Sequence, residues 1–279
     1  MSTYNDLLNE YKKVFNDKET LRAFLFELCN EYDINLYMEK DNEADKRVIE
    51  RFVDGVNKLK ENEPLNYVLG YSYFYGYKMI VNQNVLIPRF ETEELIGLVL
   101  SKYDEYYKWQ KVTLADVGTG SGAIAIALKK EEANFNVYAS DISLKALEVA
   151  KKNAQNNDAD ITFMQGSMLD PLVEDNIKLD ILVSNPPYIK QDEVLEASVK
   201  DYEPHVALFG GDDGLKFYRM IFEKAHLVMK DKGLLFFEMG YDQKENLANL
   251  AKQYFKNADI EVYKDINKKD RMLFIKLNK

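Results

Sequence analysis

The longer C-terminal part of the chain alternates apolar segments with segments of helical spacing, and this alternation limits the fold more than any other feature. Strands that alternate with helices form a parallel sheet whose two faces those helices cover. The sequence therefore predicts an α/β protein built on such a sheet. Five segments have the length and composition of its strands: VTLADV (112–117), NVYASD (136–141), ITFMQG (161–166), LDILVS (179–184) and GLLFFEMG (233–240).

The end of the chain departs from this alternation. DIEVYK (259–264) and MLFIKL (272–277) also have the composition of strands, but the segment between them is too short to hold a helix. Strands joined by so short a connection pair in the antiparallel sense. We therefore expect a sheet of seven strands that ends in an antiparallel pair.

The front of the chain has a different organisation. Leu21, Phe24 and Leu28 are spaced for one face of a helix, and similar spacings recur on either side of them among many charged residues. The aromatic and β-branched stretch that follows predicts a β-hairpin with its turn at 81–85. The chain is thus expected to have three parts: a helical substrate-recognition domain (1–73), a β-hairpin linker (74–88) and the α/β domain (89–279).

The composition argues against several kinds of site. Cys29 is the one cysteine and there are two histidines, so we predict no internal disulfide and no bound metal. The net charge of −10 argues against direct binding of nucleic acid, which needs clustered Lys and Arg. No signal peptide or membrane-spanning run is recognisable, so we expect a cytoplasmic protein that does not bind membranes.

A glycine-rich loop joins the first predicted strand of the sheet to the helix after it. Its glycines permit a tight turn and close approach of a ligand, and the helix start offers free amide donors. Asp141 ends the next strand, where a carboxylate can accept hydrogen bonds from ribose hydroxyls. The pattern favours a nucleotide-bearing ligand, but Gly118, Gly120 and Ala123 also match the dinucleotide pattern, and a tight turn without a ligand is the alternative. The loop consists of Gly118, Thr119, Gly120, Ser121 and Gly122.

Asp116 precedes this loop by two residues. A carboxylate there is unfavourable beside a pyrophosphate, which is anionic. It suits a ligand that carries positive charge, such as the amino group and sulfonium of S-adenosylmethionine. The alternative is that Asp116 only accepts hydrogen bonds from amides of the loop.

The fourth predicted strand runs directly into Asn185, Pro186, Pro187 and Tyr188. Proline lacks the donor of a strand ladder, so the strand must stop at this corner. The carboxyl ends of parallel strands share an edge, so we expect the corner to lie beside the glycine loop. A simple turn is the alternative.

This corner has the groups needed to hold a planar NH2 group. The side-chain carbonyl of Asn185 and the main-chain carbonyl of Pro186 are two acceptors, and Tyr188 offers a flat surface. Two hydrogen bonds can orient an amide and favour a tetrahedral nitrogen as it attacks a methyl donor. No strong base is needed, because the proton becomes acidic once the nitrogen is alkylated.

Several longer stretches extend the pattern over nearly the whole chain. With them the sequence resembles the HemK family of release factor glutamine methyltransferases, which are class I S-adenosylmethionine methyltransferases. The stretches are PLNYVLG (64–70), VLIPRFETEEL (85–95), DVGTGSGAIAIAL (116–128), SDISLKALEVAKKNA (140–154), SNPPYI (184–189), YEPHVALFGGDDGLKFYR (202–219) and FFEMGYDQ (236–243).

The resemblance implies a Rossmann-like methyltransferase sheet and methylation of the glutamine in the Gly-Gly-Gln motif of class 1 peptide chain release factors. S-adenosylmethionine would be the cofactor and S-adenosylhomocysteine the product. The corner from Asn185 to Tyr188 would hold the glutamine. Met168 stands where many relatives have an aromatic residue beside the adenine, and Phe90 replaces a usual proline. The residues implied in cofactor binding are Gly118, Thr119, Gly120, Ser121, Gly122, Asp141, Met168 and Asn185.

Two further features have alternative interpretations. The stretch from Arg89 to Glu93 can line the mouth of the cofactor site, or it can be a helix start with Arg89 in an ion pair. His205 lies in a loop after the fourth strand, and a structural hydrogen bond is the simpler role for it.

Other activities share parts of these motifs. A ribosomal protein glutamine methyltransferase has the same chemistry. An adenine-N6 DNA methyltransferase is less consistent with the acidic charge and with the missing target-recognition domain. A nicotinamide-dependent oxidoreductase would leave the Asn-Pro-Pro-Tyr corner without a role, and a non-catalytic cofactor-binding adaptor is a further alternative.

Overall fold

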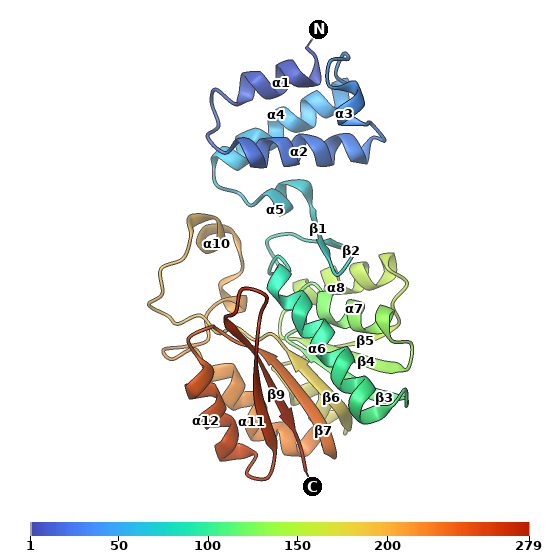
Figure 1. Cartoon of the computed structure of the whole chain (residues 1–279), viewed down its shortest axis with the longest axis vertical. Coiled ribbons are helices and arrows are strands. Elements are labelled where there is room, and N and C mark those ends of the chain that lie inside the picture. The colour runs from blue at the N-terminus through green and yellow to red at the C-terminus, as the bar shows by residue number, and fades with distance from the viewer. Residues whose placement is uncertain (1, 279) are drawn as a thin grey trace. The chain divides into compact units, whose positions relative to one another are not determined.

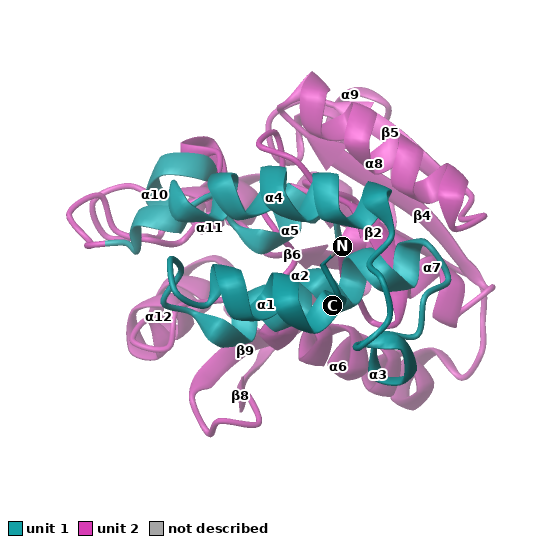
Figure 2. Cartoon of the chain, turned by 90° about the horizontal axis from the view of Figure 1, so that it is seen from above, with its two compact units in different colours: residues 1–71, 195–202 teal, residues 72–194, 203–279 magenta. Residues whose placement is uncertain are grey.

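The computed structural model describes residues 2–278, which form two compact units (Figure 2). Of the described residues, one unit comprises those up to 71 together with 195–202, and the other comprises 72–194 together with those from 203 onward. Each unit has its own hydrophobic core. In the part of the chain that the structure describes, no helix combines the length and apolar character needed to cross a membrane.

The first unit is helical, and its helices begin at residues suited to cap them. The side chains of Thr3, Asp17, Asn35 and Asp45 each accept a hydrogen bond from an amide in the first turn that follows. Phe24 stacks on the Phe52 ring at a centroid distance of 5.4 Å inside the core. The helices are α1 (Tyr4–Tyr11), α2 (Lys18–Glu31), α3 (Leu36–Glu39), α4 (Lys46–Lys60), α5 (Leu65–Leu69) and α10 (Ala197–Tyr202).

A β-hairpin follows this helical segment, but its turn is not where the sequence predicts it. The strands are β1 (Tyr71–Phe74) and β2 (Tyr77–Ile80), so the turn lies at Tyr75 and Gly76. Both turn residues have positive φ, 51° and 81°, as a two-residue hairpin turn requires. The predicted turn at 81–85 is instead a separate turn after β2, closed by a 3.0 Å bond from the Val85 amide to the Asn82 carbonyl.

The second unit contains the predicted seven-stranded sheet (Figure 1). The strand order is β5-β4-β3-β6-β7-β9-β8. The first five strands in that order are parallel, and β9 pairs antiparallel with both β7 and β8. The expected fold class is therefore confirmed. The strands are β3 (Val112–Val117), β4 (Phe135–Asp141), β5 (Ile161–Gln165), β6 (Leu179–Ser184), β7 (Met229–Glu238), β8 (Asp259–Lys264) and β9 (Asp270–Lys276).

Helices cover both faces of this sheet. Adjacent residues of a strand point to opposite faces, and Leu114 and Ala115 of β3 accordingly belong to different hydrophobic clusters. The Leu114 cluster includes residues of α6, α7 and α8, and the Ala115 cluster includes residues of α9, α11 and α12. The helical elements of this unit are α6 (Phe90–Tyr107), α7 (Ala123–Glu131), α8 (Leu144–Asn156), α9 (Asp170–Glu174), the short 3-10 helix η1 (His205–Ala207), α11 (Lys216–Val228) and α12 (Lys244–Tyr254).

The direction in which the chain adds strands reverses between β3 and β6. From β3 the chain builds outward through β4 and β5, and then returns to place β6 on the other side of β3. Backbone pairing of these two neighbours ends with Asp116 opposite Val183, and the Ser184 hydroxyl then donates a 2.6 Å hydrogen bond to the Val117 carbonyl. Ligands of open α/β sheets bind at this kind of reversal, beyond the carboxyl ends of the strands.

Two helical glycines, one in a packed position and one beside open space, allow the described packing to be tested by substitution with alanine. A Cβ on Gly55 of α4 would overlap the Phe24 ring and lie 2.9 Å from Cγ1 of Val68, whereas a Cβ on Gly97 of α6 would meet no atom within 4 Å. We expect Gly55→Ala to destabilise the chain by about 1–3 kcal/mol through overpacking. We expect Gly97→Ala to stabilise it by about 0.5–1 kcal/mol. Urea unfolding followed by circular dichroism measures both, and a shift of the same sign for the two variants would contradict the described packing.

Candidate functional site

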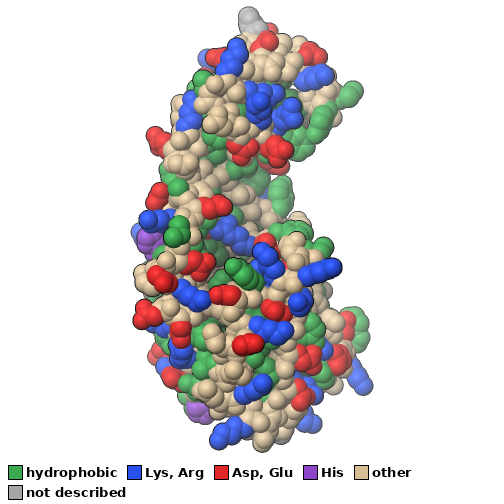
Figure 3. Space-filling view, turned by 60° about the vertical axis from the view of Figure 1, so that its left-hand side comes forward, with side chains coloured by type: hydrophobic (Ala, Val, Ile, Leu, Met, Phe, Trp, Pro, Cys, Tyr) green, Lys and Arg blue, Asp and Glu red, His purple; other side chains and the backbone are tan. Residues whose placement is uncertain are grey.

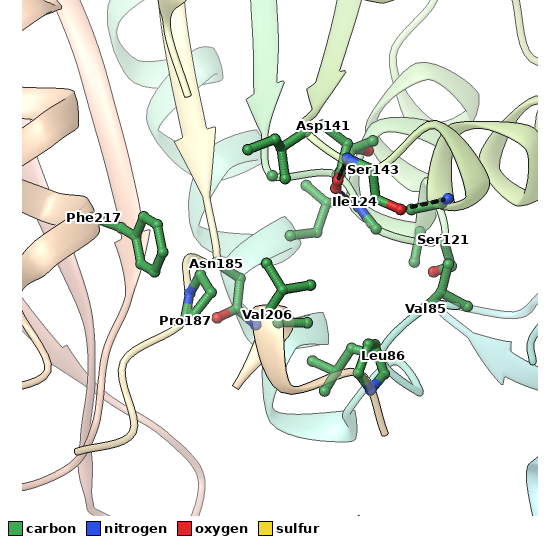
Figure 4. Close-up of a pocket in the computed structure, with 18 of the residues that line it drawn as sticks. Val85, Leu86, Ser121, Ile124, Asp141, Ser143, Asn185, Pro187, Val206 and Phe217 are labelled. Atoms are coloured by element: carbon green, nitrogen blue, oxygen red, sulfur yellow. Dashed lines mark hydrogen bonds between the residues drawn. The ribbon is translucent and has the colours of Figure 1, made fainter. Parts of the chain in front are cut away.

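A cavity of about 330 Å³ opens at the carboxyl edge of the parallel strands. Its volume is within the range of small-molecule sites. Figure 4 shows Asp141 and Ser143 on one side of the cavity and Asn185, Pro187 and Phe217 on the other. The lining comes from the segment between β2 and α6, the loops after β3, β4, β5 and β6, and the start of α11.

The glycine loop follows β3 and lines this cavity with its backbone. Gly118 and Gly120 have φ values of 77° and 55°, and no atom lies within 4 Å of the position that a Cβ would take on either. Positive φ therefore favours glycine here, and the space beside both residues is free for a ligand. Gly122 does not line the cavity; it also has a positive φ of 83°, and a Cβ there would in addition lie 3.1 Å from Cβ of Ala150 in α8.

Asp141 connects this loop to the next helix. Its Oδ2 accepts a 2.9 Å hydrogen bond from the Gly120 amide, and its Oδ1 accepts one of the same length from the Ser143 amide. Burial raises the pKa of Asp141, and these amide donors oppose that rise. The carboxylate is thus fixed in place at the cavity wall, and each oxygen retains a lone pair for a further donor.

Three further residues predicted to bind the cofactor also line the cavity. Thr119 and Ser121 are buried and line it. Met168, after β5, lines it as well and has a positive φ of 49°. The Ser140 hydroxyl holds the Met168 carbonyl at 3.1 Å, which accounts for the position of this residue.

Asp116 has a different environment from the one that its sequence position suggests. The carboxyl group is completely buried and does not line the cavity. Its Oδ2 accepts hydrogen bonds from the Thr119 hydroxyl at 2.5 Å and from the Ala125 amide at 3.2 Å. The carboxyl group therefore accepts hydrogen bonds from the loop and from α7, close to the alternative interpretation, while its Oδ1 has no hydrogen-bond partner among the described residues.

The Asn-Pro-Pro-Tyr corner lies beside the glycine loop, as expected from the parallel sheet. Asn185 and Pro187 line the cavity, whereas Pro186 is buried. Tyr188 packs against the hydrophobic cluster of α11 and α12, and its hydroxyl donates a 3.2 Å hydrogen bond to Oε1 of Glu238. The Tyr188 ring is therefore directed away from the place where the sequence suggested a flat surface for the substrate.

The amide of Asn185 is held by a second residue that had been assigned no catalytic role. Its Nδ2 lies 3.3 Å from the Thr92 hydroxyl, and that hydroxyl donates a 2.6 Å hydrogen bond to Oε2 of Glu238. Thr92 and Glu238 are both buried. The two residues are separated by 146 positions in the sequence, and no local pattern connects them.

The stretch from Arg89 to Glu93 both lines the cavity and forms a helix start with Arg89 in an ion pair. Helix α6 begins at Phe90, and Arg89 and Thr92 line the cavity. Arg89 also forms a 2.5 Å ion pair with Glu203, whose side chain is almost completely buried. His205 does not line the cavity, and its ring packs edge-on against Phe209.

Sequence reasoning missed an apolar part of the wall. Three apolar residues, Val206 in η1 and Phe217 and Met220 in α11, line the cavity. Phe217 and Met220 lie three residues apart and share a helix face. This spacing alone did not indicate a site, because apolar residues at helical spacing more often form a core.

Comparison with known proteins gives consistent matches. The family model of the methyltransferase small domain matches residues 98–202. The release factor glutamine methyltransferase of Bacillus cereus is 42% identical over 255 residues, which cover 90% of this chain and 90% of that protein. The Bacillus subtilis protein of the same name is 45% identical over 232 residues, covering 82% of this chain and 81% of that protein.

A solved structure supports the fold. The crystal structure of a methyltransferase from Pyrococcus furiosus superposes with a TM-score of 0.53 and covers 81% of this chain and 99% of that chain. The identity is 15%, so this likeness concerns the fold alone.

The burial of Asp116 makes a testable prediction about pH. Burial raises the pKa of Asp116 to about 7, while the unfolded chain keeps the ordinary value of about 3.9. As the pH rises between these values the unfolded state releases the proton first, so the fold loses stability until about pH 7. We expect wild type to lose about 2–3 kcal/mol relative to Asp116→Asn between pH 5 and pH 8.

Urea unfolding at the two pH values measures this difference. Asp192→Asn, which removes an exposed carboxyl group, is the matched control. A gap between wild type and Asp116→Asn that is the same at both pH values would contradict the assigned environment of Asp116.

Proposed function

Because the chain belongs to the family of release factor glutamine methyltransferases, we propose that it methylates the glutamine of the Gly-Gly-Gln motif in peptide chain release factors. The methyl group would come from S-adenosylmethionine and would be transferred to the side-chain amide nitrogen. The observation that carries the proposal is that the Asn185 amide and the glycine loop face one cavity from neighbouring strand ends. A cytoplasmic location follows from a substrate that acts in translation.

The proposed cofactor fits the residues that line the cavity. The free space beside Gly118 and Gly120 would receive it, and Asp141 retains lone pairs for the ribose hydroxyls. Met168 would pack beside the adenine. When bound, S-adenosylmethionine supplies an electrophilic methyl group, and S-adenosylhomocysteine remains after the transfer.

The corner after β6 would hold and orient the substrate amide. The Asn185 side-chain carbonyl and the Pro186 main-chain carbonyl would each accept a hydrogen bond from the NH2 group. These bonds favour a tetrahedral nitrogen whose lone pair forms the new bond to carbon, while the electron pair of the broken bond goes to sulfur. The nitrogen then releases a proton to water. Pro187 restricts the corner, and Tyr188 is proposed to anchor it through Glu238.

The substrate is proposed to be recognised partly by the helical unit. Tyr37 and Met38 of α3 are 79% and 81% exposed, so they form an apolar surface available to a protein partner. Acidic and basic side chains are mixed over the face shown in Figure 3. This mixture and the net charge of −10 support a protein rather than a nucleic-acid substrate.

A transfer assay tests the proposed substrate. Purified protein, methyl-labelled S-adenosylmethionine and a release factor should yield a labelled release factor, and the label should be absent when the motif glutamine is replaced by alanine. Ribosomal protein and DNA are tested in parallel. Label that persists on the altered release factor, or that occurs only on ribosomal protein or DNA, would exclude the proposed function.

The two sides of the cavity should separate binding from turnover. We expect Asn185→Ala to lower kcat by about 100-fold or more, because an orienting acceptor is lost, with little change in the Kd for the cofactor. We expect Asp141→Ala to weaken cofactor binding by about 10-fold or more, because charge-assisted hydrogen bonds are lost. Calorimetry and the transfer assay measure these effects, and equal loss of binding in both variants would contradict the division of roles.

A further inference from the structure

Three elements converge behind the Asn185 amide, on the side opposite to its carbonyl group. Asn185 follows β6, Thr92 lies in the first turn of α6, and Glu238 is the last residue of β7. We propose that Thr92 and Glu238 are positioning residues that fix the orientation of the Asn185 amide for catalysis. This inference rests on the proposed function, in which the Asn185 carbonyl accepts a hydrogen bond from the substrate amide.

The argument follows from the number of hydrogens available. The Thr92 hydroxyl carries one hydrogen, and it is donated to Oε2 of Glu238 at 2.6 Å. The hydroxyl can then only accept from Asn185, so the group of Asn185 that lies 3.3 Å away must be its NH2. The Asn185 carbonyl is consequently directed away from Thr92. The orientation is thus determined by Glu238, which does not itself line the cavity.

Glu238 is placed to act as an obligatory acceptor. The residue is 2% exposed, and its other oxygen accepts from the Tyr188 hydroxyl at 3.2 Å. Burial raises the pKa of Glu238, and the hydrogen bond from Thr92 and the charge of the nearby Arg271 guanidinium offset only part of that rise. Both oxygens of Glu238 accept a hydrogen bond, one from Thr92 and the other from Tyr188, so the Thr92 hydroxyl is the donor in its pair with Glu238.

Two further hydrogen bonds fix the surroundings of Glu238. Arg271, on β9, donates to Oδ2 of Asp265 at 3.2 Å. The hydroxyl of Tyr218, on α11, donates to the main-chain carbonyl of Glu238 at 2.6 Å. The main chain of Glu238 is therefore held from the side of α11, and its carboxylate is held by Thr92 and Tyr188.

The inference predicts a contrast between two substitutions at one position. Thr92→Val keeps the shape of the side chain but removes the hydroxyl. The NH2 group of Asn185 then loses the acceptor that fixes its orientation. We expect kcat for methyl transfer to fall by about 10-fold or more, a loss of the order of one to two hydrogen bonds, with the cofactor Kd within about twofold of wild type. Thr92→Ser keeps the hydroxyl and should stay within about threefold of the wild-type kcat. Thr113→Val, in β3 and outside the cavity, is the matched control for the loss of a threonine hydroxyl.

Glu238→Gln tests the direction of the hydrogen-bond chain without removing an atom from the network. A glutamine side chain can donate to Thr92, which frees the hydroxyl hydrogen to bond the Asn185 carbonyl instead. The Asn185 amide can then present its NH2 group to the substrate NH2 group. We expect kcat to fall by about 10-fold or more for this variant as well.

A second measurement reports on the amide itself and does not depend on activity. In protein labelled with ¹⁵N-asparagine, the side-chain NH2 resonances of Asn185 are identified by their loss in Asn185→Ala. They should shift in Thr92→Val and in Glu238→Gln and keep their wild-type position in Thr92→Ser and Thr113→Val.

The two readouts separate this inference from the proposed function. If the wild type does not methylate a release factor, the proposed function fails, and the resonances still decide whether Thr92 and Glu238 orient Asn185. The inference is overturned if these resonances are the same in Thr92→Val, Glu238→Gln and wild type. It is also overturned if an active wild type keeps its kcat in Thr92→Val, or if Thr92→Ser loses as much kcat as Thr92→Val.

Discussion

The hydrogen bond from the Ser184 hydroxyl to the Val117 carbonyl joins β6 to β3 where both strands end. This buried hydrogen bond joins the two strands one residue beyond their last backbone pair, which is Asp116 with Val183. One residue further along each strand, the glycine loop begins at Gly118 and the corner begins at Asn185. The distance between a cofactor on one segment and an amide on the other therefore depends on this junction. A parallel sheet makes the junction possible because both carboxyl ends lie on the same edge.

The sheet and the main segments of the site could be predicted from the sequence, because each is encoded by neighbouring residues. VTLADV and LDILVS match β3 and β6 residue for residue, and the glycine loop and the proline corner follow them directly. The hairpin turn was misplaced because asparagines were given more weight than the Tyr75-Gly76 pair, which adopts the required positive φ.

The missed features depend on contacts between distant residues. Tyr188 turns away from the cavity because Glu238, 50 residues later, offers a buried acceptor to its hydroxyl. Asp116 is directed toward the Thr119 hydroxyl of the loop and the Ala125 amide of α7, which both donate to its Oδ2. In both cases a buried polar group takes the hydrogen bond that is available inside the protein. A one-dimensional pattern identifies such a residue as notable but does not show its partner.

One buried side chain couples the hairpin to the cofactor loop. Asn153 of α8 donates to the Ile80 carbonyl and accepts from the Ile80 amide, at 3.0 and 2.6 Å, and it also donates to the Ser121 carbonyl at 2.9 Å. It thus takes the place of a neighbouring strand for β2. A displacement of Ile80 must either break these hydrogen bonds or move Ser121 as well. The end of β2 and the glycine loop are therefore expected to move together. A displacement of the hairpin would thus reach the glycine loop through a residue that does not line the cavity.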